Sequence, residues 1–154
     1  MPIKKSDEVA LFGYTQIDTL ITGGGSAAIN EDTRYRTVRI QQGFTNAGIA
    51  LNNDVKAFYN SGSGEVLLSS SLIEKAAKSS DIAIYVVRKS SSEWEDRDPN
   101  TNEYGYYLTE TVLNNISSVS SAFHAQGKKL VVGEMRTWTE ECFNKHTCFT
   151  ICGI

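Results

Sequence analysis

The chain has 154 residues, of which 40% are hydrophobic and 21% charged, and its formal net charge is −3 at pH 7. These values are typical of one globular domain with its own core, and the negative charge argues against a nucleic-acid partner, which requires a basic face. No apolar run approaches the roughly 20 residues of a membrane span and the first residues lack the apolar segment of a signal peptide, so we expect no membrane partner and leave the localisation open.

The first half of the chain alternates between apolar runs and glycine-rich breaks. Residues 8–13 (Glu-Val-Ala-Leu-Phe-Gly) predict a buried strand closed by a glycine. Residues 36–47 suit an amphipathic helix that Gly48 ends. Residues 55–59 (Val-Lys-Ala-Phe-Tyr) alternate enough to predict a second strand.

A glycine run at residues 23–26 (Gly-Gly-Gly-Ser) interrupts this half of the chain. Its order is not that of a dinucleotide-binding motif, and no Lys-Ser/Thr pair follows as in a P-loop, so neither phosphate motif is present. Two interpretations remain open: a loop that contacts a polar ligand, and a flexible turn.

The second half predicts an α/β fold. Ser70 or Ser71 can cap a helix that runs to Lys78. Residues 81–87 form a strand that is apolar on both faces, which indicates a sheet covered by helices on both sides. Thr109 is a plausible N-cap for a helix whose apolar stripe consists of Val112, Ile116, Val119 and Phe123. After Gly127, residues 128–132 form the next strand, so we expect a three-layer α/β/α sandwich with a mostly parallel sheet, incomplete at its C-terminal end.

An abrupt change to charged residues follows the central strand, at residues 88–97 (Arg-Lys-Ser-Ser-Ser-Glu-Trp-Glu-Asp-Arg). Ligands of open parallel sheets bind just beyond the carboxyl ends of the strands. A carboxylate here is therefore a candidate general acid or base, although a solvated acidic loop has the same composition.

Residues 133–154 differ from the rest, because they hold all three cysteines and one of the two histidines. Cys142, His146, Cys148 and Cys152 match a zinc quartet in number, but their spacing lacks the paired knuckles of structural zinc sites. We therefore expect free thiols, no metal and no cofactor.

Four segments together carry a resemblance to a known family. They are residues 9–13 (Val-Ala-Leu-Phe-Gly), residues 23–26, residues 88–97, and the helix from Leu108 with its Phe123-His-Ala-Gln-Gly-Lys-Lys129 ending. In this order and spacing, residues from about Glu8 to Val132 resemble the second, α/β-sandwich domain of family 3 glycoside hydrolases of the β-glucosidase type.

The resemblance implies roles for five residues. Glu93 falls on the family's general acid/base, with Ser92 and Trp94 where the family has glycines. Ser26 falls on a serine near the bound sugar, with Gly25 beside it. The residues that support the loop are Asp96 and Arg97.

The resemblance also implies that the chain is part of a larger enzyme. The family's nucleophile is an aspartate on a preceding (β/α)8 barrel that binds most of the β-glucoside or oligosaccharide substrate, and no barrel-length sequence is present here. We expect residues 1–132 to be a fragment of the α/β domain, inactive alone, and residues 133–154 to be an aberrant tail, for which a frameshift is one hypothesis. The alternative is a stand-alone module that binds a small molecule or a carbohydrate.

Overall fold

The structure is a computed structural model that describes residues 3–19, 38–89, 107–136 and 148–153. Its centre is one five-stranded sheet with the order β2-β1-β3-β4-β5, in which the first four strands are parallel and β5 is antiparallel to β4. The strands are β1 (Glu8–Phe12), β2 (Ala50–Leu51), β3 (Ile82–Lys89), β4 (Lys129–Arg136) and β5 (Cys148–Gly153). None of the helices in the described ranges has the length and apolarity required to cross a membrane.

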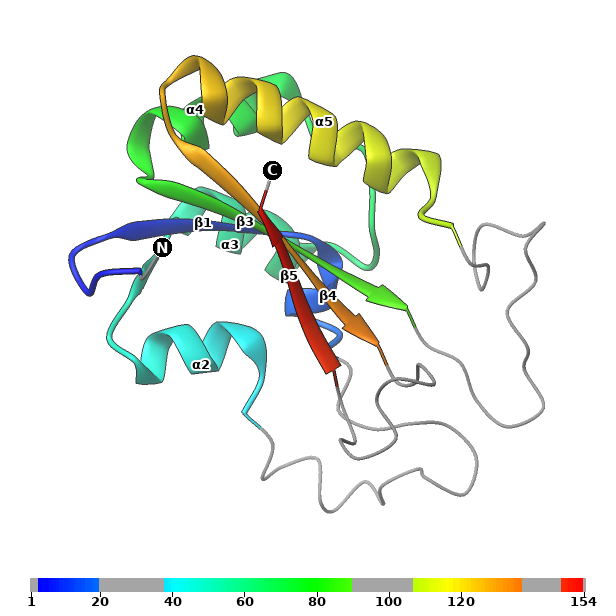
Figure 1. Cartoon of the computed structure of the whole chain (residues 1–154), viewed down its shortest axis with the longest axis horizontal. Coiled ribbons are helices and arrows are strands. Elements are labelled where there is room, and N and C mark those ends of the chain that lie inside the picture. Colours follow the sequence, from blue (N-terminus) through cyan, green and yellow to red (C-terminus); the bar gives the residue numbers. More distant parts are fainter. Residues whose placement is uncertain (1–2, 20–37, 90–106, 137–147, 154) are drawn as a thin grey trace.

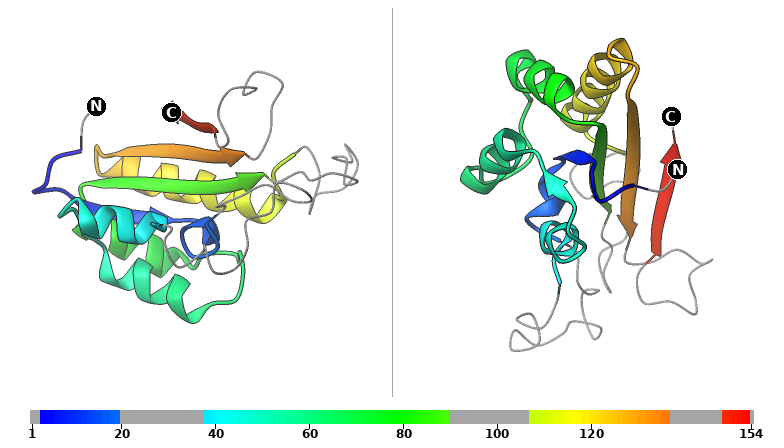
Figure 2. Two further views of the ribbon diagram at one scale, coloured as in Figure 1. Left: turned by 90° about the horizontal axis from the view of Figure 1, so that it is seen from below. Right: turned by 90° about the vertical axis from the view of Figure 1, so that its left-hand side faces the viewer.

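Helices cover both faces of this sheet. The helices are the 3₁₀ turn η1 (Tyr14–Gln16), α2 (Ile40–Asn46), α3 (Asn53–Ser61), α4 (Ser70–Ser79) and α5 (Glu110–Ala125). Helices α3, α4 and α5 contribute to one apolar cluster and α2 to the other, which gives three layers (Figures 1 and 2). The predicted α/β/α sandwich with a mostly parallel sheet is therefore confirmed.

Strand β3 is central because both of its faces are apolar. Ala83, Tyr85 and Val87 lie in the cluster with α3, α4 and α5, and the alternate residues Ile84 and Val86 lie in the cluster with α2. A strand buried on both faces is what a parallel sheet between two helical layers requires. The apolar run at residues 81–87 predicted this position correctly.

Residues 55–59 were predicted as a strand, and this prediction is wrong, because they lie in the middle of helix α3. Val55 and Tyr59 are spaced by four and both are buried, so the same residues satisfy a helical period. The Asn52 side chain accepts a hydrogen bond from the Val55 N–H and caps the helix.

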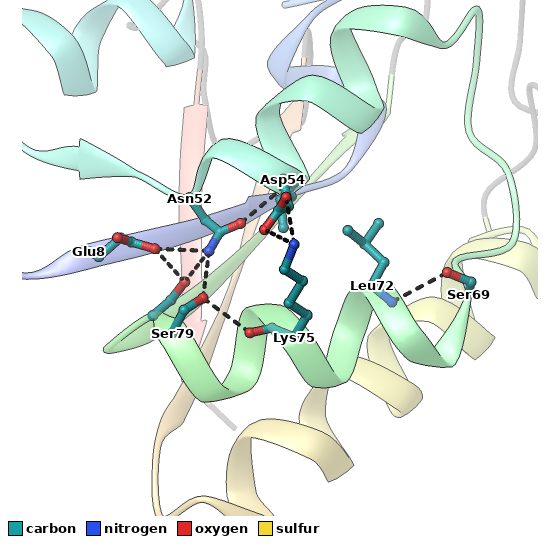
Figure 3. A network of polar contacts seen from close by, with 9 residues as sticks. Glu8, Asn52, Asp54, Ser69, Leu72, Lys75 and Ser79 are labelled. Atoms are coloured by element: carbon teal, nitrogen blue, oxygen red, sulfur yellow. Dashed lines mark hydrogen bonds and ion pairs between the residues drawn. The ribbon is translucent and has the colours of Figure 1, made fainter.

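The amino end of the sheet is held by Asn52 (Figure 3). Its Nδ2 lies 2.9 Å from both Glu8 Oε1 and Ser79 Oγ, and 3.0 Å from Ser80 Oγ. One buried amide therefore connects the start of α3 with the start of β1 and the end of α4. Beside it, Lys75 on α4 forms an ion pair with Asp54 on α3 at 3.0 Å.

The C-terminal part of the sheet extends further than the sequence indicated. The strand predicted to end at Val132 runs to Arg136, and β5 pairs with it from Cys148 to Gly153. The boundary drawn after Val132 and the aberrant origin of the tail remain predictions.

Candidate functional site at the carboxyl edge of the sheet

A cavity of about 190 Å³ lies where β1 and β3 end. Its walls come from η1, the end of β3, the start of α5 and the connection between α3 and α4. The lining residues with polar side chains are Tyr14, Thr15, Asp18, Glu65, Arg88, Lys89 and Thr109. This is the edge at which open parallel sheets bind ligands.

The cavity exists because the chain turns sharply at Gly13. Gly13 has a φ of 92°, and a Cβ placed on it would lie 2.0 Å from the carbonyl oxygen of Val86. Only glycine permits such a φ together with such an approach. The turn sends η1 across the end of β3, where it forms one wall of the cavity.

A buried glutamine keeps η1 in place. Gln16, only 1% exposed, donates from Nε2 to the carbonyl oxygens of Leu11 and Gly13 at 2.6 and 3.2 Å. Its Oε1 accepts a hydrogen bond from Gln41 on α2 at 2.8 Å. The turn after β1 is therefore tied both to its own strand and to the helix on the opposite face.

Glu65 connects several of the elements that surround the cavity. Its Oε2 accepts the Tyr14 N–H at 2.6 Å, and its Oε1 accepts from the Tyr85 hydroxyl at 2.7 Å and from Asn115 Nδ2 at 3.0 Å. Asn115, which is buried on α5, also accepts the Leu68 N–H at 2.9 Å. One carboxylate thereby joins η1, β3 and α5 from a connection without regular structure.

Burial and the charge of this carboxylate together raise the pKa values of two tyrosines, Tyr85 and Tyr59. Burial raises the pKa of Tyr85 far above its ordinary value, and the negative charge of Glu65 raises it further. The same two causes, in the same order, raise the pKa of Tyr59. Both hydroxyls therefore stay protonated in the folded protein, and Tyr85 acts as a donor to Glu65.

Two cations lie at the end of β3. Lys89 is 9% exposed, and its ammonium donates a hydrogen bond to the carbonyl oxygen of Tyr107. Arg88, on the opposite side of the strand, forms an ion pair with Asp18 at 2.5 Å. The strand end is thus connected to the residues before α5 and to the residues after η1.

A further pair of contacts joins the residues on either side of range 20–37. Arg39 Nη1 donates to the carbonyl oxygen of Ile17 at 3.3 Å, and the Ile40 N–H donates to Thr19 Oγ1 at 3.5 Å. The residues before range 20–37 and the residues after it therefore lie next to each other at the carboxyl edge of the sheet.

The five predicted site residues lie outside the described residues. Gly25 and Ser26 belong to range 20–37, and Glu93, Asp96 and Arg97 belong to range 90–106. Their roles remain predictions. The described residues do show where both ranges attach, which is the edge predicted for the site.

Glu65, Tyr85 and Asn115 were not predicted as site residues. Glu65 stands between glycines and apolar residues with no motif around it, and its partners are 51, 20 and 50 positions away. Within the described ranges, no group of three His, Cys, Asp or Glu residues has the geometry of a metal site.

The fold and the cavity define an α/β domain with a hollow at the carboxyl edge of a parallel sheet. No family model matches the chain. Known proteins do match it: a β-glucosidase from Ruminococcus albus is 31% identical over 126 residues, which covers 70% of this chain and 13% of that protein.

Solved structures give the same result. β-Glucosidase 3B from Thermotoga neapolitana, in complex with α-D-glucose, superposes with a TM-score of 0.76 at 29% identity, covering 86% of this chain and 20% of that one. A β-glucosidase from Paenibacillus barengoltzii gives 0.74 at 25% identity, covering 89% and 16%. The predicted resemblance is confirmed: the chain is similar to part of these β-glucosidases and spans about a fifth or less of their length.

Proposed function

We propose that the chain is the domain that carries the acid/base residue of a retaining β-glucosidase-like glycoside hydrolase. In this proposal Glu93 protonates the departing alcohol of a β-glucoside or oligosaccharide and then activates water. The observation that carries the proposal is the match to Thermotoga neapolitana β-glucosidase 3B, whose structure contains glucose, at 29% identity over 86% of this chain.

The described residues next to the two ranges that carry the predicted site residues support the proposal. Range 20–37, which carries Gly25 and Ser26, begins after Thr19, and range 90–106, which carries Glu93, begins after Lys89. Asp18 and Arg88, the residues before these two, are in direct contact. The two ranges that would contact the sugar therefore follow residues that lie in contact at the same edge of the sheet.

The chemistry requires a second carboxylate from elsewhere. A retaining glycosidase uses two carboxyl groups about 5–5.5 Å apart, one as nucleophile and one as acid and then base. We assign the nucleophile to the (β/α)8 barrel domain that is the proposed partner of this chain. Asp96 and Arg97 would hold the loop, and the isolated chain would be inactive.

Two measurements test this assignment. The purified chain should not hydrolyse an aryl β-glucoside. A chimera, in which residues 8–132 replace the matching segment of the Thermotoga neapolitana enzyme, should hydrolyse it, and Glu93→Gln should abolish that activity while leaving the circular dichroism unchanged. Activity of the isolated chain that survives Glu93→Ala, or of the chimera that survives Glu93→Gln, would refute the role of Glu93.

A second candidate function is a stand-alone binding module. The described cavity favours it, because it is bounded on several sides by polar side chains that need no second domain. Calorimetry with glucose, cellobiose and nucleotides separates the two candidates. Micromolar binding by the isolated chain supports a module, and millimolar or absent sugar binding supports half of a divided site.

We also propose that residues 133–154 are an aberrant tail from a frameshift or gene fragment. Their polar, cysteine-containing sequence replaces the apolar continuation that the family resemblance implies. The coding DNA tests this directly. If no other reading frame beyond Val132 restores family-like sequence, the frameshift hypothesis is wrong.

A further inference from the structure

One hydroxyl group in the wall of the cavity at the carboxyl edge is available for a ligand. Thr15 on η1 lines this cavity and is 7% exposed. Its carbonyl oxygen accepts a hydrogen bond from Thr19 at 3.2 Å, but within the described part of the chain its hydroxyl has no hydrogen-bond partner. Because a buried hydroxyl without a partner costs free energy, a ligand hydroxyl bonded to it would be favourable.

Glu65 supplies an acceptor on the adjoining part of the wall. The N–H of Tyr14, the residue directly before Thr15, donates to Glu65 Oε2 at 2.6 Å. Two further donors bond to Oε1, so three of the about four positions at which a carboxylate can accept are used. The remaining position on Glu65 and the Thr15 hydroxyl together suit groups that both donate and accept, which is what alcohol groups do.

The charges of the cavity wall favour a neutral ligand. The wall holds two anionic side chains, Asp18 and Glu65, and two cationic ones, Arg88 and Lys89. Asp18 and Arg88 form an ion pair, and Lys89 donates to the carbonyl oxygen of Tyr107. A site for an ion requires an excess of the opposite charge, and these four side chains provide none.

The size of the cavity limits the ligand to one small molecule. Its volume is about 190 Å³, below the roughly 300–1,000 Å³ of pockets that enclose drug-sized ligands. Val86, Val87, Leu108 and Val112 form an apolar part of the wall, which suits the C–H groups of a polyol. We propose that this cavity binds one small neutral polyol, no larger than a monosaccharide ring, whose hydroxyl groups bond to Thr15 and Glu65. This inference rests on the second function proposed above, ligand binding at the described cavity, and not on the role of Glu93.

Amide NMR on the uniformly ¹⁵N-labelled full chain locates the binding. Glycerol, erythritol and D-glucose are the probes, with inorganic phosphate and methylammonium as charged comparisons. We expect at least one polyol to give saturable shifts of the Tyr14, Thr15, Thr109 and Val112 amides. The Ala76 amide of α4, which is not part of the cavity wall, should not move.

Thr15→Val separates binding from stability. It removes the hydroxyl and keeps the branched shape, so we expect polyol affinity to fall about three- to tenfold. The melting temperature should stay within about 3 °C of the wild type, because no hydrogen bond of the folded protein is lost. Thr15→Ser retains the hydroxyl and should retain binding. Thr15→Ala removes the same hydroxyl without adding volume and replaces Thr15→Val if that variant does not fold.

Two other threonines are the matched controls. The Thr19 hydroxyl bonds to the carbonyl oxygens of Thr15 and Gln16 and to the Ile40 N–H, so Thr19→Val should lower the melting temperature, unlike Thr15→Val. The Thr45 hydroxyl bonds to Gln41 on α2, away from the cavity wall. Thr45→Val should therefore leave polyol binding unchanged.

The outcomes distinguish this inference from the acid/base proposal. Glucose binding that leaves the cavity amides unmoved, or that withstands Thr15→Val, takes place elsewhere, as the acid/base proposal allows, and refutes polyol binding here. Equal shifts of all amides, or no saturable shift with any polyol, also refute it. Tighter binding of phosphate or methylammonium at the same amides would show that the ligand is not neutral. Loss of activity in the Glu93→Gln chimera has no bearing on these results.

Discussion

Gly13 lies so close to the neighbouring backbone that there is no room for a side chain. A methyl group there would meet the Val86 carbonyl at 2.0 Å, and the φ of 92° disfavours any side chain. We expect Gly13→Ala to destabilise the protein by at least about 3 kcal/mol, because β3 cannot move away without losing its ladder with β1. Chemical denaturation followed by circular dichroism measures this.

Gly48 is the control for that experiment. It also has a positive φ, of 71°, but no atom lies within 4 Å of the Cβ position. Gly48→Ala should cost only the backbone strain, about 1 kcal/mol. Equal losses at the two positions would show that the close approach to Val86 does not matter.

Tyr85 and Tyr59 predict a pH dependence at alkaline pH. Their pKa values are raised in the folded protein, whereas tyrosines of the unfolded chain titrate near pH 10. Between these values the folded protein holds protons that the unfolded chain has lost. Stability is therefore complete below pH 10 and falls above it, by about 1.4 kcal/mol per pH unit for each of these tyrosines.

Tyr85→Phe tests this dependence. We expect the free energy of unfolding to fall by about 1–2 kcal/mol at neutral pH, because Glu65 loses a hydrogen-bond donor. The decrease of stability with pH above pH 10 should become roughly half as steep, because only one of the two tyrosines still contributes to it. Denaturation at several pH values gives the slope, and the ultraviolet tyrosinate signal gives the titration. An unchanged slope would mean that Tyr85 ionises in the folded protein.

Residues that act through local backbone could be predicted, and residues that act through distant partners could not. Thr109 caps α5 through the Val112 N–H as expected, because the cap and its partner are three positions apart. Glu65 has no such local signal, since its three donors come from elements that only the fold brings together.

At the scale of the elements, helix α3 depends strongly on the side chain of Asn52. Asn52 caps it and also bonds to Glu8 and to the end of α4, with 3% exposure. Asn52→Ala should therefore cost about 2–4 kcal/mol, more than an ordinary cap, because it removes the acceptor of the Val55 N–H and three further hydrogen bonds at a buried position. Thermal or chemical denaturation measures the loss.

Ser69 gives the comparison within the same layer. It caps α4 by accepting from the Leu72 N–H, and it is exposed. Ser69→Ala should cost about 1 kcal/mol. A loss at Asn52 no larger than this would show that the bonds to Glu8 and α4 contribute nothing beyond capping.

Element types were predictable where a pattern was long. The helix at residues 110–125 has an apolar stripe over several turns, and the strand at residues 82–89 has a continuous apolar run. At residues 55–59 the window was too short, because Val55 and Tyr59 lie on one side in both a strand and a helix. The predicted cap at Ser70 or Ser71 was wrong by one or two positions, since Ser69 is the N-cap.

At the scale of the whole molecule, the three layers could be predicted, because a strand that is apolar on both faces requires helices on both sides of the sheet. Right-handed crossovers and two-sided burial of β3 leave few arrangements. The antiparallel strand β5 could not be predicted. Its residues lie outside the segments that resemble the family, and its pairing with the edge of β4 depends on the folded sheet rather than on a local sequence pattern.

That edge leads to a prediction about residues 137–154. The four parallel strands and the helices of the described ranges all end by Arg136, so a variant ending at Arg136 should keep its circular dichroism. It would, however, lose β5 and expose the outer edge of β4, as the arrangement in Figure 2 indicates. An unpaired strand edge is a template for another chain.

We therefore expect the variant ending at Arg136 to self-associate more than the full chain when both are compared by sedimentation velocity over the same concentrations under reducing conditions. A full-length variant with Cys142, Cys148 and Cys152 changed to serine controls for the loss of the thiols. Because it retains the backbone of β5, it should behave like the wild type. Loss of circular dichroism in the truncated chain would instead mean that β5 is required for folding, and unchanged sedimentation would mean that β5 does not protect the edge of β4.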